Sequence, residues 1–188
     1  MKKRCEWVKG QPEIYLKYHD EQWGVPVHDD RLLFAKLVLD GAQAGLSWLT
    51  ILKKRENYFD AFDNFDIETV AGYDNEKVEE LMQNPGIIRN RLKINSAVKN
   101  AIAIIEIQKE FGSFDTYLWD FIDNITIQNN FIDINEVPAK TSLSERISRD
   151  MKKRGMNFVG PTIIYAFMQA IGMVNDHTND CFRNKELL

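Results

Sequence analysis

Long hydrophobic runs are missing from this chain of 188 residues, and no stretch reaches the roughly 18 apolar residues that cross a bilayer. Residues 1–7 lack the apolar segment of a signal peptide, and the chain has no fixed-period repeat and no low-complexity tract. Because 44% of its residues are hydrophobic, intrinsic disorder and fibrous classes are excluded. We expect a soluble, cytoplasmic protein with no membrane partner, and a monomer by default.

Positive charge is also in short supply, since 24 Lys and Arg stand against 28 Asp and Glu, for a net charge of −4. The chain as a whole therefore does not indicate a polyanion partner. The charges are segregated, however: residues 60–80 carry eight acids and one base, whereas residues 81–105 carry no acid. Two basic groups result, Arg89, Arg91, Lys93 and Lys99, and Arg146, Arg149, Lys152, Lys153 and Arg154. These groups are either a local phosphate-binding face or ordinary solvated helix faces.

The hydrophobic pattern is almost entirely helical. Apolar residues recur at helical spacing over 33–38, 46–52 and 94–105. Asp66 and Asp74 are typical helix starts, each followed by acids in the first turn. Alternation suggestive of a strand is confined to residues 125–131, where a connecting loop is the preferred interpretation. The pattern predicts an all-α fold, with residues 1–188 as one unit in which any two helical lobes interleave and the N-terminal segment packs on the C-terminal part.

Pro161 and Gly172 bracket an apolar segment, residues 162–171, that predicts a central helix. Proline suits the first turn of a helix, and glycine suits the left-handed position just after its end. A helix that is apolar nearly all round lies at the centre of a fold. Residues 124–141 are the one candidate for a long loop.

The two cysteines lie near opposite ends of the chain, and each has a histidine nearby: Cys5 with His19, and His177 with Cys181. The second spacing puts two ligands on one face if that turn is helical. Two thiolates and two imidazoles form a closed tetrahedral Zn²⁺ site, which is structural because no position is left for an activated water. The alternatives are a Cys5 to Cys181 disulfide, improbable in a cytoplasmic chain, or two unrelated thiols. His28 has no such company and is expected at the surface.

A glycine turn follows the second basic group. Residues 152–162 read as the end of a basic helix, a tight turn and the start of the apolar helix. Gly160, just before that helix, leaves backbone amides free to hold a phosphate at the helix N-terminus. Together these features suggest a helix-hairpin-helix, which clamps the DNA backbone without reading sequence. A second glycine turn at residues 84–91 either adds backbone contacts or is a plain helix connection.

Aromatic residues are dense in the first fifty positions, where Trp7, Tyr15, Tyr18, Trp23 and Trp48 accompany Asp40. Aromatic rings that sandwich a planar base, with a carboxylate at its edge, are what an enzyme needs to hold a nucleotide flipped from the stack. The competing interpretations are that the aromatics are core residues and that Asp40 is an exposed polar residue or a helix cap.

Motifs along nearly the whole chain resemble those of the DNA-3-methyladenine glycosylase I family. The matching segments, in chain order, are Cys5-Glu6-Trp7, Tyr18-His19-Asp20, Trp23-Gly24-Val25-Pro26, Gln43-Ala44-Gly45-Leu46-Ser47-Trp48, residues 52–58, Gly86-Ile87-Ile88-Arg89, Phe158-Val159-Gly160 and Val174-Asn175-Asp176-His177. The resemblance implies a helical helix-hairpin-helix glycosylase that excises 3-methyladenine from alkylated double-stranded DNA. It implies structural Zn²⁺ at Cys5, His19, His177 and Cys181, and no organic cofactor.

The resemblance also assigns the site residues. The family's base pocket maps onto Trp7, Tyr15, Tyr18 and Trp48, and the Gly45-Leu46 pair falls where the family wedges the gap left in the duplex. Phosphate contact falls to the Gly160 turn and its basic neighbours. Asp40 stands where the family typically has a glutamate, so the carboxylate persists on a side chain one methylene shorter.

The implied reaction needs few titratable groups. Methylation at N3 makes the adenine cationic, so the base leaves as a neutral molecule and needs no general acid. A monofunctional hydrolase also needs no lysine nucleophile. Other helix-hairpin-helix glycosylases tend to carry an aspartate shortly after the hairpin helix, where this chain has Asn175; we therefore interpret Asp176 as a cap for the turn that holds His177.

Two other functions stay open at this level. Because of Asp40, the chain is alternatively a non-catalytic or altered-specificity relative that binds DNA lesions, which predicts salt-dependent DNA binding without base loss. A zinc-stabilised enzyme acting on a free purine or nucleoside is the third hypothesis.

Overall fold

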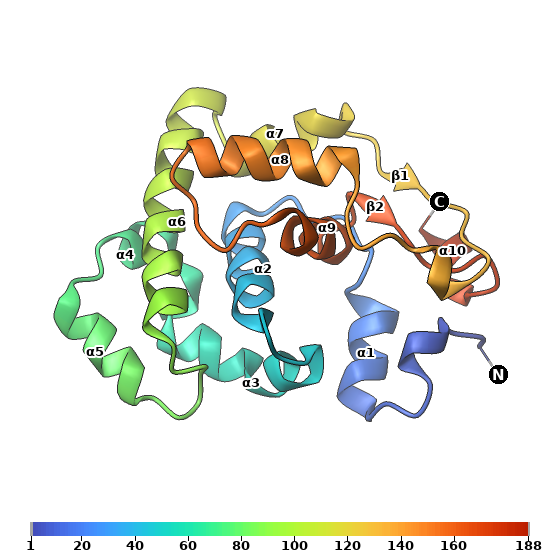
Figure 1. Ribbon diagram of the computed structural model, residues 1–188, viewed down its shortest axis with the longest axis horizontal. Coiled ribbons are helices and arrows are strands. Elements are labelled where there is room, and N and C mark those ends of the chain that lie inside the picture. The colour runs from blue at the N-terminus through green and yellow to red at the C-terminus, as the bar shows by residue number, and fades with distance from the viewer. Residues whose placement is uncertain (1, 188) are drawn as a thin grey trace.

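The computed structural model describes residues 2–187 and is predominantly helical, as the sequence predicts (Figure 1). The α-helices of this range are, in chain order, α1 (Glu13–Glu21), α2 (Asp30–Gln43), α3 (Trp48–Ala61), α4 (Ile67–Ala71), α5 (Asn75–Gln83), α6 (Arg91–Phe111), α7 (Phe114–Trp119), α8 (Ser142–Lys153), α9 (Pro161–Ala170) and α10 (Phe182–Glu186). Short 3-10 helices lie at η1 (Glu6–Val8), η2 (Asp63–Phe65), η3 (Asp120–Ile122) and η4 (Ile134–Glu136). None of the helices within residues 2–187 is long and apolar enough to span a membrane.

Polar side chains set where several of these helices begin. Asp66 and Asp74 are the N-caps of α4 and α5, and each carboxylate accepts a hydrogen bond of 2.9 Å from a backbone N–H in the first turn. Both predicted starts are confirmed. Ser47 caps α3 in the same way, so that helix begins at Trp48 and Leu46 lies outside it. The helical spacing expected from residue 46 is therefore wrong at its first position.

Helix α9 runs through the middle of the molecule, between α2 and α8 (Figure 1). It begins with Pro161, and Gly172 follows its end with φ of +77°, so both predicted boundaries are confirmed. Ile164, Phe167 and Met168 are almost fully buried and join the main hydrophobic core, as a central helix requires. Helix α9 therefore forms the centre against which α2 and α8 pack.

Two short strands join segments that are distant in sequence. Strand β1 (Ile127–Gln128) pairs in parallel with β2 (Val174–Asn175), and Ile127 N donates to Met173 O at 3.0 Å. The prediction of a connecting loop over 125–131 is wrong at these two residues. A strand of two residues is too short to show alternation of apolar and polar residues. Its partner strand, β2, comes after α9 in the sequence. The predicted long loop, residues 124–141, thus contains both β1 and η4.

The N-terminal segment lies against the C-terminal one. Phe182 N donates a hydrogen bond of 2.8 Å to Lys3 O, and the ends of the chain lie on the same side of the molecule (Figure 1). A second, smaller apolar cluster forms there, separate from the main core, from Cys5, Tyr18, Trp23, Leu52 and Cys181. The assignment of residues 1–188 to one unit stays a prediction, and it includes Met1 and Leu188, which lie outside the described residues.

Candidate active site and metal centre

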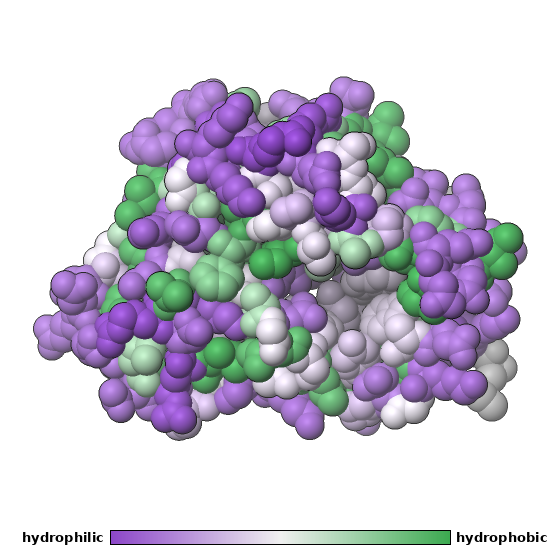
Figure 2. Space-filling model, in the orientation of Figure 1, coloured by the Kyte–Doolittle hydropathy of each residue, from purple (hydrophilic) through white to green (hydrophobic). Residues whose placement is uncertain are grey.

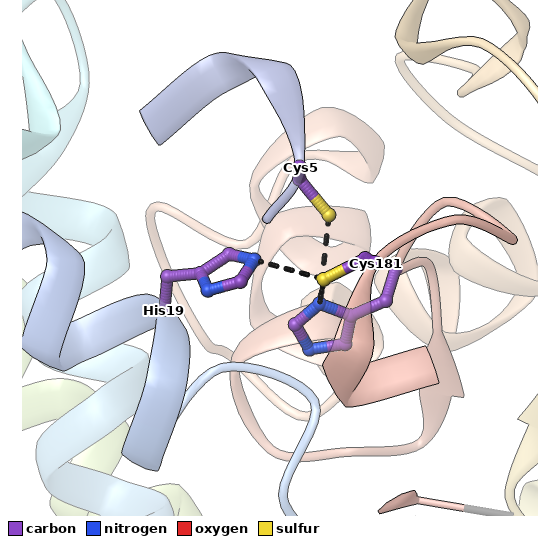
Figure 3. A group of neighbouring side chains, drawn as sticks. Cys5, His19 and Cys181 are labelled. Atoms are coloured by element: carbon purple, nitrogen blue, oxygen red, sulfur yellow. Dashed lines mark hydrogen bonds between the residues drawn. The ribbon is translucent and has the colours of Figure 1, made fainter. Parts of the chain in front are cut away.

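Four side chains from opposite ends of the chain meet in one buried cluster. Cys5 precedes η1, His19 belongs to α1, and His177 and Cys181 follow β2 (Figure 3). The ligand atoms all lie within 4.8 Å of one another, and the four residues are at most 2% exposed. The cluster predicted from two distant Cys and His pairs is therefore present as a group.

The distances in this cluster fit a tetrahedral metal. Cys5 Sγ and Cys181 Sγ each lie 3.5 Å from His177 Nδ1, and Cys181 Sγ lies 3.5 Å from His19 Nε2. Ligands bound at about 2.0–2.3 Å around a tetrahedral Zn²⁺ lie about 3.3–3.8 Å from one another. Three of the ligand pairs have this spacing, and all four ligand atoms lie close enough together to be candidates for holding one such ion.

The outer nitrogens of both histidines have acceptors that fix the rings. His177 Nε2 donates to the carbonyl oxygen of Trp23 at 3.1 Å, and His19 Nδ1 donates to Asp20 Oδ1 at 2.8 Å. The Asp20 carboxylate in turn accepts hydrogen bonds from the Arg4 guanidinium, at 2.8 Å to Oδ1 and 2.7 Å to Oδ2. These bonds direct the lone pairs of His19 Nε2 and His177 Nδ1 toward the cysteines, as outer partners of metal-bound histidines do.

One of the two thiols is prepared for ionisation. Its contact with the Cys5 thiol, together with the neighbouring imidazoles of His177 and His19, lowers the pKa of Cys181 to about 2 despite burial. The same thiol pair raises the pKa of Cys5. A thiolate is the form that binds metal. One expectation fails here: the chain from His177 to Cys181 is an irregular turn and not a helix.

The predicted aromatic residues line a cavity of about 270 Å³ beside this cluster. Trp7, Tyr15, Tyr18 and Trp48 are all in its wall, which is completed by Trp23, Asp40, Gln43, Ile134, Val137, Ala166 and Gln169. In Figure 2 the surface is hollowed between α1 and α9, and the residues around the hollow are pale, of intermediate hydropathy. The cavity thus opens to solvent between helices from both halves of the chain.

The rings in this wall are held by edge contacts that leave faces available. Trp7 packs edge-on against Tyr15 at 5.5 Å and against Trp23 at 4.9 Å, and Tyr18 lies 5.2 Å from Trp48 at 54°. Trp7 also contacts the ring of His19 at 5.2 Å, so the cavity wall and the Cys/His cluster share a boundary. Such tilted aromatic pairs are well packed and resist collapse of the cavity.

Asp40 lies in the last turn of α2, inside the wall of the cavity. Its side chain is 4% exposed, and Oδ2 has no hydrogen-bond partner within the described residues. The interpretations of Asp40 as an exposed residue or a cap are therefore wrong. Trp48 Nε1 is a second buried polar atom without a partner. Unpaired buried polar atoms are costly and mark places where a ligand completes the hydrogen bonds.

Burial raises the pKa of Asp40 to about 7, and the charge of Lys36 opposes that rise. Lys36 lies one turn earlier on α2, and its Nζ donates to Ala170 O at 3.0 Å. Both residues line a second cavity of about 390 Å³, which shares Tyr18, Asp40 and Trp48 with the aromatic cavity. Sequence reasoning missed Lys36, although its i, i+4 spacing from Asp40 was available as a signal.

The Gly45-Leu46 pair forms an exposed turn between α2 and α3. Gly45 has φ of +77°, and Leu46 is 40% exposed. Lys93 holds this turn from α6, because its Nζ donates to Ala42 O at 2.8 Å and to Ala44 O at 2.7 Å. The turn therefore projects a large apolar side chain from a fixed base.

The turn between α8 and α9 places Gly160 at the N-cap of α9. A Cβ added at Gly160 would meet nothing within 4 Å, so the backbone there is open to a partner. Ser148 anchors the turn by donating to Val159 O at 2.6 Å. The turn predicted to end the basic helix is thus confirmed as a connection, with an accessible helix N-terminus beyond it.

Some cations of the two predicted basic groups form ion pairs or hydrogen bonds within the protein. Arg91 pairs with Glu79, Lys93 holds the Gly45 turn, and Arg154 is bound by both Asp150 and Glu110. Arg146 is exposed but donates to Phe121 O at 3.0 Å, so the exposed cations that remain in the two groups are Arg89, Lys99, Arg149, Lys152 and Lys153. A charge count along the sequence does not reveal which cations have partners.

Asp176 is a buried acceptor at the centre of a network. Its carboxylate accepts hydrogen bonds of 2.7 Å from Tyr165, Gln169 and Asn129. The amide of His177 is satisfied by the side chain of Asn175 instead. The interpretation of Asp176 as the cap of that turn is therefore wrong, because the cap is its neighbour. His28, by contrast, is exposed as expected and pairs with Asp115 at 2.8 Å.

Comparison with known proteins gives consistent matches over nearly the whole chain. The DNA-3-methyladenine glycosylase of Haemophilus influenzae is 46% identical over 96% of this chain and 97% of its own length. DNA-3-methyladenine glycosylase 1 of Escherichia coli is 46% identical over 95% of each chain. A crystal structure of 3-methyladenine DNA glycosylase I (TAG) superposes with a TM-score of 0.93, at 46% identity, covering 96% of this chain and 98% of that one.

A structure of the Staphylococcus aureus enzyme, described as the basis of its 3-methyladenine recognition, also has a TM-score of 0.93, at 33% identity over 96% of each chain. The sequence matches the methyladenine glycosylase family over residues 7–184. With the aromatic cavity and its buried carboxylate in place, these matches lead to one conclusion: the chain belongs to the methyladenine glycosylase family.

Proposed function

We propose that this protein is a DNA-3-methyladenine glycosylase, which hydrolyses the N-glycosidic bond of 3-methyladenine in alkylated double-stranded DNA. Relatives 46% identical over nearly their full length carry that name. Within this chain, the observation that carries the proposal is the buried Asp40 Oδ2, which has no partner and lies in the wall of an aromatic cavity.

The cavity suits a flipped purine. The rings of Trp7, Tyr15, Tyr18 and Trp48 stack on the base, and Asp40 Oδ2 accepts a hydrogen bond from its exocyclic amino group. Trp48 Nε1, which is also unpartnered, donates to a ring nitrogen. The donor Trp48 Nε1 and the acceptor Asp40 Oδ2 match the hydrogen-bonding edge of a purine. Because both atoms are buried, a base with a different edge would leave them unpaired, at a cost in binding free energy.

The chemistry follows from the charge of the lesion. N3-methylation gives the adenine a positive charge, so the departing base is neutral and needs no proton from a general acid. The carboxylate of Asp40 attracts the cationic base in a setting of low dielectric and stabilises charge on the sugar while water attacks. Among the described residues, no lysine lines the aromatic cavity, which supports a monofunctional hydrolase without a lyase step.

The DNA contacts divide between two exposed turns. Leu46, projecting from the Gly45 turn, fills the gap that the flipped nucleotide leaves in the duplex. Gly160 and the N-terminus of α9 hold a backbone phosphate, so α8, the turn and α9 act as a helix-hairpin-helix. Arg149, Lys152 and Lys153 are exposed on α8 and add salt-dependent attraction to neighbouring phosphates.

Cys5, His19, His177 and Cys181 hold a structural Zn²⁺ that ties the two ends of the chain together. Their burial, the distances of 3.5 Å in three of their pairs and the outer partners of both histidines fit that ion. Since all four positions come from the protein, the ion supplies stability and no activated water. It fixes His19 and thereby the neighbouring Tyr18 and Trp7 in the cavity wall.

The experiment measures purines released from N-methylated duplex DNA by native protein, Asp40→Glu and Asp40→Asn. Release of 3-methyladenine by native protein, with loss in Asp40→Asn, is the expected result. Asp40 is one methylene shorter than the glutamate usual in the family, and a bond lengthened by that much weakens by about 1–3 kcal/mol unless water bridges it. Asp40→Glu is therefore expected to match or exceed the native rate.

Salt-dependent duplex binding without base release by metal-loaded native protein would overturn the proposal. Recovery of release in Asp40→Glu would then identify the chain as a lesion-binding relative that has lost its chemistry. Competition by a single nucleoside as effective as that by duplex DNA would instead favour an enzyme acting on free purines.

A further inference from the structure

Lys36 is a partly buried cation that the proposed reaction does not use. It lies on α2, four residues before Asp40, so the two side chains project from the same face of one helix. Its ammonium group donates to the carbonyl of Ala170, the last residue of α9, at 3.0 Å. A lysine is rarely withdrawn from water unless its charge has a partner or a role.

Asp40 and Lys36 line a common cavity of about 390 Å³. Asp40, Tyr18 and Trp48 line the aromatic cavity as well, whereas Lys36 does not. Asp40 is thus shared by the two cavities, and Lys36 is absent from the lining of the cavity proposed to hold the base.

The hydrogen bond of Lys36 to α9 leaves the carboxylate available. Asp40 Oδ2 has no hydrogen-bond partner, so Lys36 acts on Asp40 by its charge and not by occupying that oxygen. A direct ion pair would block the acceptor that a base requires. The carbonyl of Ala170 holds the ammonium group at 3.0 Å, and no ion pair between Lys36 and Asp40 forms that would occupy the acceptor.

Other charged and titratable groups around Asp40 are engaged elsewhere. Arg55 on α3 donates to Gln22 at 2.7 Å and pairs with Glu56 at 3.1 Å. Glu21 and Tyr18 face the same region from α1, and Lys93 on α6 is bound to carbonyls at the end of α2. Lys36 is the cation whose charge offsets the burial of Asp40.

We propose that Lys36 is a positioning residue, and that its fixed charge keeps Asp40 as a carboxylate whose free oxygen selects cationic alkylated purines. A protonated Asp40 would present a hydroxyl donor to the amino group of the base and would lose its attraction for a cation. Selection of the charged lesion over ordinary adenine would then weaken. The selectivity part rests on the proposed function, whereas the effect of Lys36 on Asp40 does not.

The ionisation of the lysine fits this role. Burial lowers the pKa of Lys36 to about 8, while the charge of Asp40 raises it. Each of the two charges thus favours the charged form of the other residue. Removing that charge leaves burial unopposed, so that the pKa of Asp40 rises further.

The test compares native protein with Lys36→Met, Lys36→Gln and Lys36→Arg. Methionine fills similar space without charge, glutamine keeps a donor without charge, and arginine keeps the charge. Lys109→Met is the matched control, since Lys109 is an exposed lysine on α6 paired with Glu106. The Asp40 carboxyl is titrated by carbon-13 NMR, with its signal assigned by comparison with Asp40→Asn.

The expected result is an upward shift of the Asp40 midpoint by about 1–2 pH units in Lys36→Met and Lys36→Gln. Lys36→Arg and Lys109→Met should titrate as native protein does. In base-release assays, the acidic limb of the pH profile of both neutral variants should move by the same amount, and their rates should approach the native rate at high pH. Release of unmodified adenine relative to 3-methyladenine should rise near neutral pH.

An unchanged Asp40 midpoint in a folded neutral variant would overturn the proposal and leave Lys36 as an anchor of α9. A rate loss equal at every pH, accompanied by reduced thermal stability, would point the same way. If native protein released no base, the proposed function would fail, but the carboxyl titration would still decide the effect of Lys36. Lys36→Gln keeps the test available if Lys36→Met does not fold.

Discussion

Lys93 donates from Nζ to the carbonyl oxygen of Ala44 at 2.7 Å, and so connects the long helix α6 to the turn that projects Leu46. The same ammonium group bonds to Ala42 O, so it closes the C-terminal end of α2. A cation at a helix C-terminus also interacts favourably with the helix dipole. The turn that projects Leu46, the side chain proposed to enter DNA, is thus held in place by the ammonium group of Lys93.

Lys93→Met should therefore loosen the Gly45 turn and weaken binding to duplex DNA that contains an abasic site. Hydrogen bonds from a charged donor contribute about 1.5–3 kcal/mol, so we expect a loss of affinity of roughly tenfold or more. Fluorescence anisotropy at fixed salt provides the measurement. Lys99→Met removes an exposed charge from the same helix and is the control; an equal loss in both variants would show that only charge matters.

Metal removal should destabilise the whole chain. An ion that binds only the folded state at a thousand times its Kd contributes about 4 kcal/mol. For a chain of this size, that loss lowers Tm by roughly 8–16 °C. Calorimetry with and without a strong chelator measures the effect, alongside metal analysis. Cys181→Ser should melt low and be insensitive to chelator; native protein with much less than one zinc per chain would contradict the assignment.

Burial of Asp40 should make stability fall as pH rises. The pKa of this carboxyl is raised from 3.8 to about 7, so the folded state holds the proton more tightly than the unfolded state. The stability it contributes is fully present below about pH 4 and is lost as the pH passes about 7. Asp40→Asn should gain on native protein by up to about 4 kcal/mol over that range. Urea unfolding at several pH values is the measurement, and a pH-independent difference would refute the burial argument.

Asp176 should prove structural. Asp176→Ala removes the acceptor of three hydrogen bonds of 2.7 Å from a site that is 1% exposed. Because the donors stay buried, we expect a loss of about 3–5 kcal/mol in the free energy of unfolding. Asp60→Ala, at an exposed position, is the control. A selective loss of base release in Asp176→Asn, with Tm unchanged, would instead give Asp176 a part in the reaction.

Gly172 allows the chain after α9 to pass close to the segment before α2. A Cβ at this position would collide with backbone atoms of Val25 and Pro26, and φ is +77°. Gly172→Ala should cost about 3–5 kcal/mol, measured by urea unfolding. Gly112→Ala isolates the backbone strain, since Gly112 has φ of +90° but open space around it, and should cost about 1–2 kcal/mol. Equal losses of stability in the two variants would show that the neighbouring backbone shifts to accommodate a Cβ at position 172.

Local signals in the sequence predicted much of the fold because they act within a few residues. The N-caps Asp66 and Asp74, and the proline and glycine that bound α9, are such signals. The Cys/His cluster could also be predicted, because the chain has only two cysteines and three histidines from which such a metal site can form. A helix at 177–181 would put His177 and Cys181 on one face, yet the irregular turn there brings the same side chains together.

Features that depend on distant partners could not be predicted. The strand pairing of Ile127 with Val174 needs α9 in place between them. Whether a cation already has an ion-pair partner depends on its neighbours in space, as with Arg91, which is exposed and pairs with Glu79. The burial of Asp40 and the role proposed for Lys36 likewise depend on α1, α3 and α9 packing around α2, and none of these contacts leaves a mark in local composition.

The Cys/His cluster also has a consequence for the order in which the protein is made. Cys5 and His19 are synthesised first, and His177 and Cys181 follow only after nearly all the rest of the chain. A growing chain on the ribosome therefore has only two of the four donors of the proposed metal site, and His19, whose ring Trp7 contacts, still lacks its partners from the C-terminal segment. The proposed base pocket would thus be completed only after the C-terminal segment has been made.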